Sequence, residues 1–348
     1  MTRPNFPAAS FMAIAKGTVA AEPQIKRYMG IGAVKILALN PSRAEINKIY
    51  GSDNGNTEEP KYIGVGKVRD KNGVEQDCQQ IRLTFYAKTD PNVACNNGIE
   101  AIIPITIFLT KAYSFSTKDG VTKVQVIDKY GRTAWVTEAE LKAGAIPDYT
   151  VRIGEHAGEK KKADLAEGYK PCYVGQEQLV KLIIAWLNIP SPRVWDPDQK
   201  QFFLRPAEQL PDSECMLEHI NDYFTGDLRE LREVMTYQPE NAVKYGFGVR
   251  TATNGTQYQC VYLNCPMKFG DTRYSQFEKA LEDDRQYGRH PSEEYEVGPL
   301  HEVTLTATNY ADKKNENTDP DPFAAVAQAP VAPIGVEEDL PGADPFAG

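Results

Sequence analysis

Residues 79–136 contain successive segments in which apolar and polar side chains alternate, and this pattern limits the possible folds more than any other feature of the chain. Alternation with a period of two is typical of β-strands that bury one face. In residues 80–88 the apolar face consists of Ile81, Leu83, Phe85 and Ala87. In the longer segment 103–116 it consists of Ile103, Ile105, Ile107 and Leu109. Both segments are therefore predicted to be strands.

Tight turns connect these segments. Lys118-Asp119-Gly120 predicts a hairpin, because Asp-Gly tolerates the positive φ angles of a two-residue turn. A strand is predicted at 121–128, with Val124 and Val126 directed inward, and another at 132–136. Residues 61–69 and 79–88 are predicted to form a further hairpin across a loop that contains Asn72-Gly73. Strands joined by hairpins, and not by helical crossovers, favour an antiparallel sheet.

Helices are predicted mainly in the second half of the chain. Ser42 with Glu45, and Thr137 with Glu140, match capping boxes at the start of two short helices. Helical spacing of apolar residues predicts a helix at 176–189, with Trp186 in the core. The remaining predicted elements are a strand at 33–39, helices at 214–223, 227–237 and 273–287, and strands at 242–252, 257–264 and 302–308.

The order of strands, then helices, then strands indicates an α+β fold. A small antiparallel barrel with a helix between its third and fourth strands is the oligonucleotide-binding (OB) pattern. The sequence thus predicts one OB-like domain over 31–310 with an enlarged helical insertion at 137–238. Residues 1–30 are predicted to be a flexible arm and 311–348 a disordered acidic tail. A split sandwich of the same strands would give the same pattern.

Signals for catalysis are weak. The chain has no P-loop, no G-x-S-x-G motif and no complete dinucleotide fingerprint, so an enzyme is not expected. Six cysteines form no C-x-x-C pair and four histidines show no ligand spacing, so neither a metal site nor another cofactor is expected. No apolar run approaches the roughly 20 residues that span a bilayer, and no secretion signal is evident. We therefore expect a cytoplasmic protein that does not contact membranes.

Basic and aromatic side chains alternate along the polar faces of the predicted strands, which is typical of surfaces that bind single-stranded nucleic acid. The predicted DNA-binding residues are Arg82, Tyr86, Lys88, Lys111, Tyr113, Phe115, Lys123, Tyr130, Arg132 and Trp135. The charge balance opposes this interpretation. The net charge is −9, of which residues 311–348 contribute −6 (eight acidic residues and two lysines), so the rest of the chain carries only −3. This balance gives no strong electrostatic footprint for nucleic acid.

The acidic tail contains two near copies of one motif, Asp319-Pro320-Asp321-Pro322-Phe323-Ala324 and Asp344-Pro345-Phe346-Ala347. It resembles the acidic Pro-Phe tip of bacterial and phage single-stranded DNA-binding proteins, although Ala347 and Gly348 follow the final Phe here. The resemblance implies that the tip docks into replication or recombination proteins and that the tail competes with DNA for the groove. The residues that would contact such a partner are Phe323, Glu337, Glu338, Asp339, Asp344, Pro345 and Phe346. A tail that only solubilises the protein remains the alternative.

Residues 33–51, which include Val-Lys-Ile-Leu-Ala-Leu-Asn-Pro-Ser-Arg-Ala-Glu-Ile, together with the β-rich middle of the chain resemble proteins of large tailed phages of gut bacteria, crAss-like phages among them. This resemblance implies a phage replication protein made in the cytoplasm of the host. The sequence therefore predicts a non-catalytic single-stranded DNA-binding protein whose oligomeric state is open. Two alternatives remain: a structural or cargo protein of the virion, and a metal-dependent nuclease that uses acidic pairs such as Asp283-Asp284.

Overall fold

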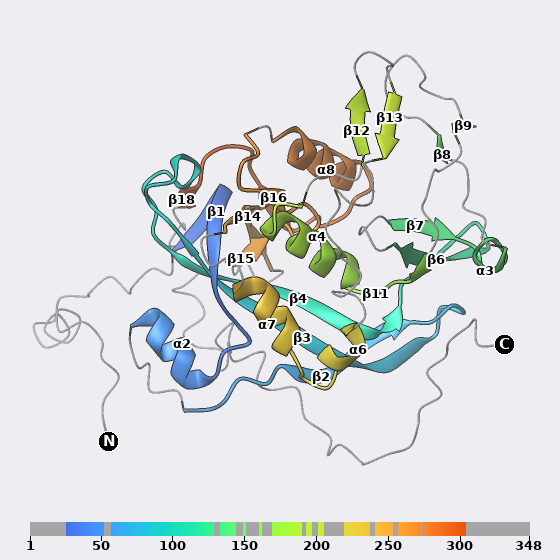
Figure 1. Cartoon of the computed structure of the whole chain (residues 1–348), viewed down its shortest axis with the longest axis horizontal. Helices are drawn as coiled ribbons and strands as arrows, with labels where there is room; N and C mark the ends of the chain where they lie inside the picture. The colour runs from blue at the N-terminus through green and yellow to red at the C-terminus, as the bar shows by residue number, and fades with distance from the viewer. Residues whose placement is uncertain are drawn as a thin grey trace, which may run out of the picture. The chain divides into compact units, whose positions relative to one another are not determined.

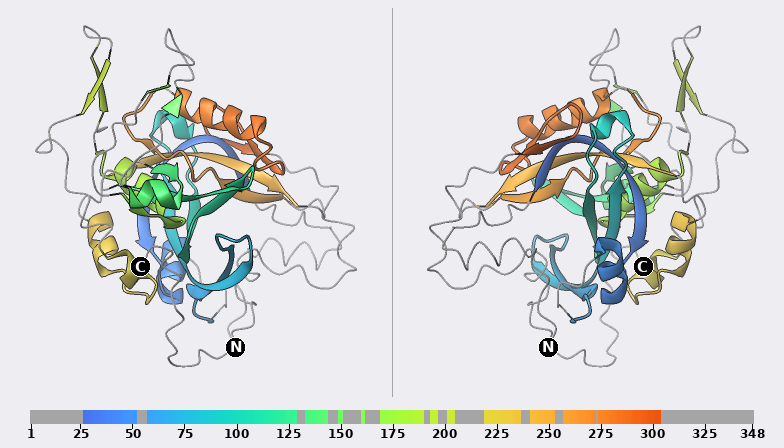
Figure 2. Two further views of the ribbon diagram at one scale, coloured as in Figure 1. Left: turned by 90° about the vertical axis from the view of Figure 1, so that its right-hand side faces the viewer. Right: turned by 90° about the vertical axis from the view of Figure 1, so that its left-hand side faces the viewer.

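The protein is mixed α+β, built on a curled antiparallel sheet (Figures 1 and 2). The computed structural model describes residues 26–51, 57–128, 133–143, 149–150, 160–161, 169–189, 193–196, 201–204, 219–236, 241–252, 257–272 and 274–303. These residues form two compact units. Strands β3 (Glu75–Thr89) and β4 (Ile102–Tyr113) supply residues to both units. The α+β class and the antiparallel sheet predicted from the sequence are confirmed.

Unit 1 combines the first strand of the chain with its last strands. Besides residues 83–89 of β3 and 102–106 of β4, it contains β1 (Arg27–Leu39), α2 (Arg43–Tyr50), the 3₁₀ turn η1 (Ala94–Asn96), β14 (Val243–Thr251), β15 (Gln257–Val261), β16 (Met267–Lys268), α8 (Ser275–Gln286), β17 (Glu293–Tyr295) and β18 (His301–Val303). Strand β1 pairs with β14 along one edge and with β3 along the other. Strand β1 therefore connects the two parts of the unit 1 sheet.

Strand β1 begins at Arg27, within the segment predicted to be a flexible arm. The prediction was wrong for residues 27–30, because their backbone pairs with β18 and β14 and Met29 is buried. Glycine is required at two positions of this strand. A Cβ atom on Gly30 would lie 2.5 Å from the carbonyl oxygen of Pro299, and one on Gly32 would lie 2.8 Å from the Phe247 ring. Two such glycines weaken the apolar pattern by which a strand is predicted from sequence.

Helix α8 packs against β14 and the Tyr262 ring in unit 1. Phe277 is fully buried and meets Tyr262 edge-on, with 5.4 Å between ring centres. Gly246 of β14 makes this contact possible, since a Cβ atom there would lie 2.1 Å from the Phe277 ring. At the other end of β1, helix α2 has the predicted capping box of Ser42 and Glu45.

Unit 2 contains the remaining elements. These are β2 (Ile63–Arg69), residues 75–82 of β3, residues 107–113 of β4, β5 (Phe115–Lys118), β6 (Val121–Ile127), β7 (Thr133–Val136), α3 (Glu138–Lys142), β8 (Tyr149–Thr150), β9 (Lys160–Lys161), β10 (Lys170–Pro171), β11 (Tyr173–Val174), α4 (Gln176–Trp186), β12 (Arg193–Asp196), β13 (Gln201–Leu204), α6 (Ile220–Tyr223) and α7 (Arg229–Thr236). Six of these strands lie in the predicted helical insertion 137–238, so that segment is not purely helical.

The predicted hairpins are confirmed. Strands β2 and β3 pair from Ile63↔Ile81 to Arg69↔Glu75, and the carboxylate of Asp70 accepts hydrogen bonds from backbone N–H groups of the intervening turn. Strands β5 and β6 are joined by Asp119 and Gly120, which adopt φ angles of 52° and 76°. The predicted strand 103–116 is broken at Ser114. Its N–H donates to the Cys172 carbonyl, and its own carbonyl accepts from the Gln125 N–H, so β4 and β5 join different neighbours.

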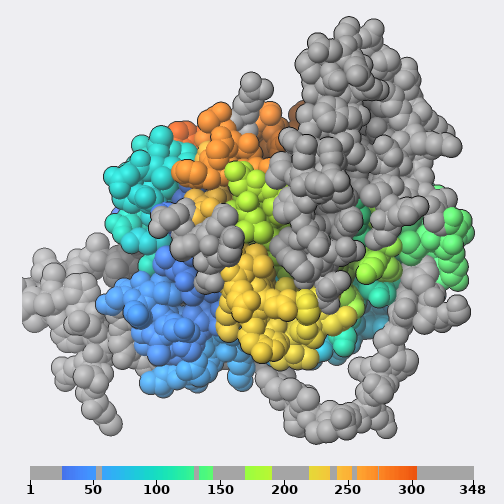
Figure 3. All heavy atoms as spheres, viewed as in Figure 1, coloured from blue at the N-terminus to red at the C-terminus, as the bar shows by residue number. Residues whose placement is uncertain are grey.

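Helices cover one face of the β2–β3–β4 strands within unit 2 (Figure 1). The side-chain amide of Gln79 donates to the Phe224 carbonyl at 2.7 Å, and Gly226 contacts Ile63. Helix α4 buries Leu179, Leu182, Ile183 and Trp186, as predicted. It ends at Trp186, earlier than predicted, and Asn188 then adopts a left-handed φ of 53°. Part of the surface seen in Figure 3 is formed by the residues of α6 and α7.

No helix in the part of the chain that the structure describes combines the length and the apolarity needed to cross a lipid bilayer.

Candidate nucleic-acid interface

The face of β2–β3–β4 that lies opposite α6 carries polar, small and aromatic side chains. Strand register places Gly64 and Gly66 of β2 beside Gln80 and Cys78 of β3. Across β3 from β2, the Gln80 amide donates to the Thr110 hydroxyl at 2.8 Å. This contact places Gln80 of β3 beside Thr110 of β4. We call this surface the Arg82 face, and it consists of Gly64, Gly66, Val68, Gln76, Cys78, Gln80, Arg82, Phe108 and Thr110.

Arg82 and Phe108 form the centre of the Arg82 face. The guanidinium carbon of Arg82 lies 5.7 Å from the centre of the Phe108 ring, within the range of a cation–π contact. Phe108 is 45% exposed although it lies within a strand. A large aromatic side chain exposed beside a planar cation is suited to stacking on flat, electron-rich groups such as nucleobases.

Two acidic residues of β3 lie on the other face of the same hairpin, and a third, Asp70 in the turn, accepts a hydrogen bond from the side-chain amide of Gln76 at 2.8 Å. Glu75 and Asp77 alternate with the residues of the Arg82 face along β3, and Lys67 pairs with Glu75 at 3.1 Å on their side. None of the residues that form the Arg82 face is itself acidic, and the Asp70 carboxylate borders the face at Gln76. Burial and the nearby Asp77 charge raise the pKa of the Cys78 thiol, so this side chain stays neutral near pH 7. The only formal charge among the nine residues of this face is the positive charge of Arg82.

Because residues 64 and 66 are glycines, β2 projects no side chain from these two positions of the Arg82 face. A Cβ atom on Gly66 would lie 2.4 Å from the Gln80 side-chain nitrogen, so Gln80 could not extend across β2 if any other residue stood there. Gly64 has no neighbour within 4 Å of the equivalent position. The two glycines thus leave β2 without side chains on the far side of Gln80 and Arg82 from Phe108, where a planar ligand could lie.

Two predicted DNA-binding residues lie in unit 1 and contact protein groups there. Tyr86 is only 6% exposed and meets Tyr50 of α2 edge-on, with 6.1 Å between ring centres. Burial raises the pKa of Tyr86. Lys88 forms an ion pair with Glu100. Tyr86 was predicted to lie on an outward face, but α2 covers that face at this position, so Tyr86 belongs to the core.

Tyr113 and Phe115 also pack against protein. Both border the hydrophobic cluster of Val124, Val126 and Val136. Tyr113 additionally stacks on Tyr173, with ring centres 5.1 Å apart and planes inclined by 22°. These two rings are half-buried and their contacts are already made within unit 2, so the structure places them away from an open stacking surface.

Lys123 and Trp135 lie on the opposite face of β5–β6–β7 from Phe115, as the register Ser116↔Lys123 and Gln125↔Trp135 requires. Trp135 is 39% exposed. Lys111 is exposed near the end of β4, one residue after Thr110. The predicted residues therefore occupy several surfaces rather than one. Tyr130 and Arg132 lie outside the described residues, as do all seven predicted partner-binding residues of the tail.

The sequence analysis did not identify Phe108, Gln80 or Thr110 as site residues. A signal for Phe108 existed, because it is the one aromatic residue on the polar side of the alternation in 103–110, between Thr106 and Thr110. Its cross-strand pairing with Arg82 depends on the register of β3 and β4. That register is a tertiary property and cannot be derived from either strand alone.

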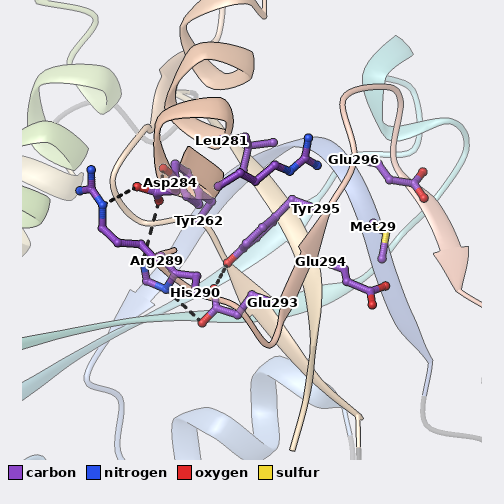
Figure 4. Close-up of a pocket in the computed structure, with 11 residues that line it drawn as sticks. Met29, Tyr262, Leu281, Asp284, Arg289, His290, Glu293, Glu294, Tyr295 and Glu296 are labelled. Carbon is purple, nitrogen blue, oxygen red and sulfur yellow. Dashed lines mark hydrogen bonds and ion pairs between the residues drawn. The ribbon is translucent and has the colours of Figure 1, made fainter. Parts of the chain in front are cut away.

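Unit 1 has a separate pocket of about 330 Å³ beside α8 and β17 (Figure 4). Asp284, although buried, accepts a hydrogen bond from the Tyr262 hydroxyl at 2.6 Å and pairs with the Arg289 guanidinium at 3.2 Å. Tyr295 donates to Glu293 at 2.5 Å. His290 lies between the two carboxylates, 3.9 Å from Asp284 and 3.5 Å from Glu293.

Three side chains at this pocket have raised pKa values. Burial, together with the hydrogen bond to Asp284, raises the pKa of Tyr262, and burial likewise raises the pKa of Tyr295. Burial also raises the pKa of the neighbouring Cys260 thiol to about 11. A thiol and two phenols with raised pKa values are poor nucleophiles at neutral pH. The arrangement is that of a network that stabilises the contact between α8 and β17.

Within the described residues, no group of three or more His, Cys, Asp or Glu side chains is placed to hold a metal ion. Comparisons with protein-family models, with curated proteins and with solved structures found no match to this chain.

Proposed function

We propose that this protein binds single-stranded DNA and that the Arg82 face is part of the binding surface. The observation that carries the proposal is the exposed Phe108 ring with the Arg82 guanidinium 5.7 Å from its centre, on a face none of whose own residues is acidic. Stacking of a base on an aromatic ring contributes on the order of 1–3 kcal/mol and requires no particular base.

In this proposal Phe108 stacks a base, and Arg82 either stacks on a neighbouring base or pairs with a phosphate. Gln80, whose side-chain amide donates to the hydroxyl of the buried Thr110 at 2.8 Å, offers its amide group to base edges. Lys111, Lys123 and Trp135 remain candidates for phosphate and base contacts. Tyr86, Tyr113 and Phe115 are no longer included, because each is packed against protein.

The proposal extends to the fold and to the biological role. A curled antiparallel sheet with helices is compatible with an OB-like barrel enlarged by residues 137–238. We propose that the protein acts in phage DNA replication or recombination in the host cytoplasm. The acidic residues of 311–348 would recruit partner proteins through Phe346 and Phe323, since an aromatic anchor flanked by carboxylates fits a pocket with a basic rim.

The test is fluorescence anisotropy of a labelled oligo-dT titrated with the wild-type protein and with Phe108→Ala at two salt concentrations. We expect binding that weakens with salt and a loss of affinity in the variant. Phe269→Ala is the matched control, because Phe269 is an equally exposed phenylalanine of unit 1 at 46%. Equal losses in both variants would reject the Arg82 face as the site. If the wild-type protein does not bind at all, single-strand binding is rejected and a virion component becomes the better hypothesis.

A further inference from the structure

Strand β2 forms an edge of the sheet in the part of unit 2 that the structure describes. Its seven residues pair with β3 along one side, and no other described strand pairs with it. The hydrogen-bonding groups along the second side of an edge strand are a ready template for a strand from another molecule.

The first half of β2 lacks the features by which proteins protect such edges. Val65 is 70% exposed and Ile63 is 39% exposed, while Gly64 carries no side chain. Natural edge strands usually carry charges, a proline or a bulge. Here the first charge is that of Lys67, and its ammonium group is bound to Glu75 of the same hairpin at 3.1 Å. The pairing of β2 with β3 is also regular, without a bulge, from Ile63 to Arg69.

We propose that two copies of this chain associate by antiparallel pairing of β2 with β2, with Val65 at the twofold axis. This register places Val65 against the partner's Val65, so the most exposed apolar side chain of the strand is covered. It places Gly64 beside the partner's Gly66, where no side chains collide, and Ile63 beside the partner's Lys67. The aliphatic part of Lys67 can then cover Ile63 while its ammonium group stays with Glu75.

The sequence of the strand supports a second copy as the occupant rather than an unrelated peptide. Ile-Gly-Val-Gly-Lys is nearly symmetric about Val65 in the size of its side chains, as an isologous strand pair requires. Lys67 and Arg69 of β2 are balanced by Glu75 and Asp77 of β3, so the hairpin as a whole does not repel its copy. This inference concerns the strand edge alone and does not depend on binding to DNA.

The test is sedimentation equilibrium of the full chain without DNA, for the wild-type protein and for Val65→Lys. We expect a concentration-dependent dimer in the wild type. The variant should weaken dimerisation by at least about tenfold, because like charges placed directly opposite each other destabilise a strand pair. Val74→Lys is the control, since Val74 is also an exposed valine of this hairpin, at 56%, but lies in the turn.

A wild-type protein that remains monomeric over the whole concentration range would overturn the proposal. So would a dimer that Val65→Lys leaves intact, or one that both lysine variants disrupt equally. Val65→Cys provides a second measurement that keeps the native charge. Mild oxidation should cross-link this variant into a covalent dimer at least about tenfold faster than Val74→Cys, because close pairs in sheets meet the geometry of a disulfide.

Discussion

The Arg82 guanidinium lies over the Phe108 ring, 5.7 Å from its centre, across two neighbouring strands of unit 2. The contact joins the positive charge of the Arg82 face to its exposed aromatic ring. If this pair binds DNA, its charge and its planarity should contribute separately, and substitutions can distinguish the two.

We expect Arg82→Lys to lower the affinity for oligo-dT while leaving the salt dependence unchanged, because lysine keeps the charge but has no planar group to stack. Arg82→Gln should lower the affinity as well and also reduce the slope of log K against log salt by about 1, as the loss of one phosphate contact does. Anisotropy titrations over a series of salt concentrations measure both quantities. Identical salt slopes for the two variants would show that Arg82 does not contact phosphate.

Removal of residues 311–348 should tighten binding to oligo-dT, most strongly at low salt, because eight carboxylates that compete with DNA are removed. Competition titrations of the full chain and of a chain ending at Tyr310 measure this. Phe346→Ala in the full chain should leave DNA affinity unchanged while reducing pull-down of replication proteins. If Phe346→Ala leaves every partner interaction unchanged, the recruitment proposal is wrong.

Gly175→Ala should destabilise the protein by more than about 2 kcal/mol. Gly175 adopts a φ of 88°, and a Cβ atom there would lie 2.0 Å from the Phe108 carbonyl oxygen. A left-handed conformation alone costs a non-glycine residue about 1–2 kcal/mol. Gly73→Ala is the control, because Gly73 has a φ of 80° but no neighbour within 4 Å. Urea unfolding of the two variants should give the larger loss for Gly175→Ala, and equal losses would contradict the close approach.

Tyr262→Phe should destabilise the protein near pH 7 by about 1–3 kcal/mol, since the buried Asp284 loses a hydrogen-bond donor. The pKa of Tyr262 is raised above its ordinary value of 10.0. The protonated phenol therefore contributes its full stability below about pH 10, and this contribution is lost as the pH rises further. The difference in unfolding free energy between wild type and variant should shrink above about pH 10. Tyr287→Phe, an exposed tyrosine 55% accessible, should show no such change.

Local patterns of the sequence were sufficient to predict most individual elements. Alternation identified the buried faces of β3 and β4, Asp119-Gly120 identified the β5–β6 hairpin, and Ser42 with Glu45 identified the start of α2. Each of these signals depends on residues that are close along the chain, so the physics that produces the structure is also local. The α+β class follows from the order of such elements.

The tertiary structure decided which polar faces are covered. Tyr86 and Arg82 lie on the same side of the alternation in β3, yet α2 buries Tyr86 while Arg82 pairs with Phe108. Likewise, Phe115 and Trp135 were predicted to share a surface, but the register of β5, β6 and β7 places them on opposite faces. Strand register and helix packing are set by contacts between residues distant in sequence. The sequence alone therefore determined the elements and their buried faces, and only the tertiary structure determined which aromatic and basic side chains lie together at the surface.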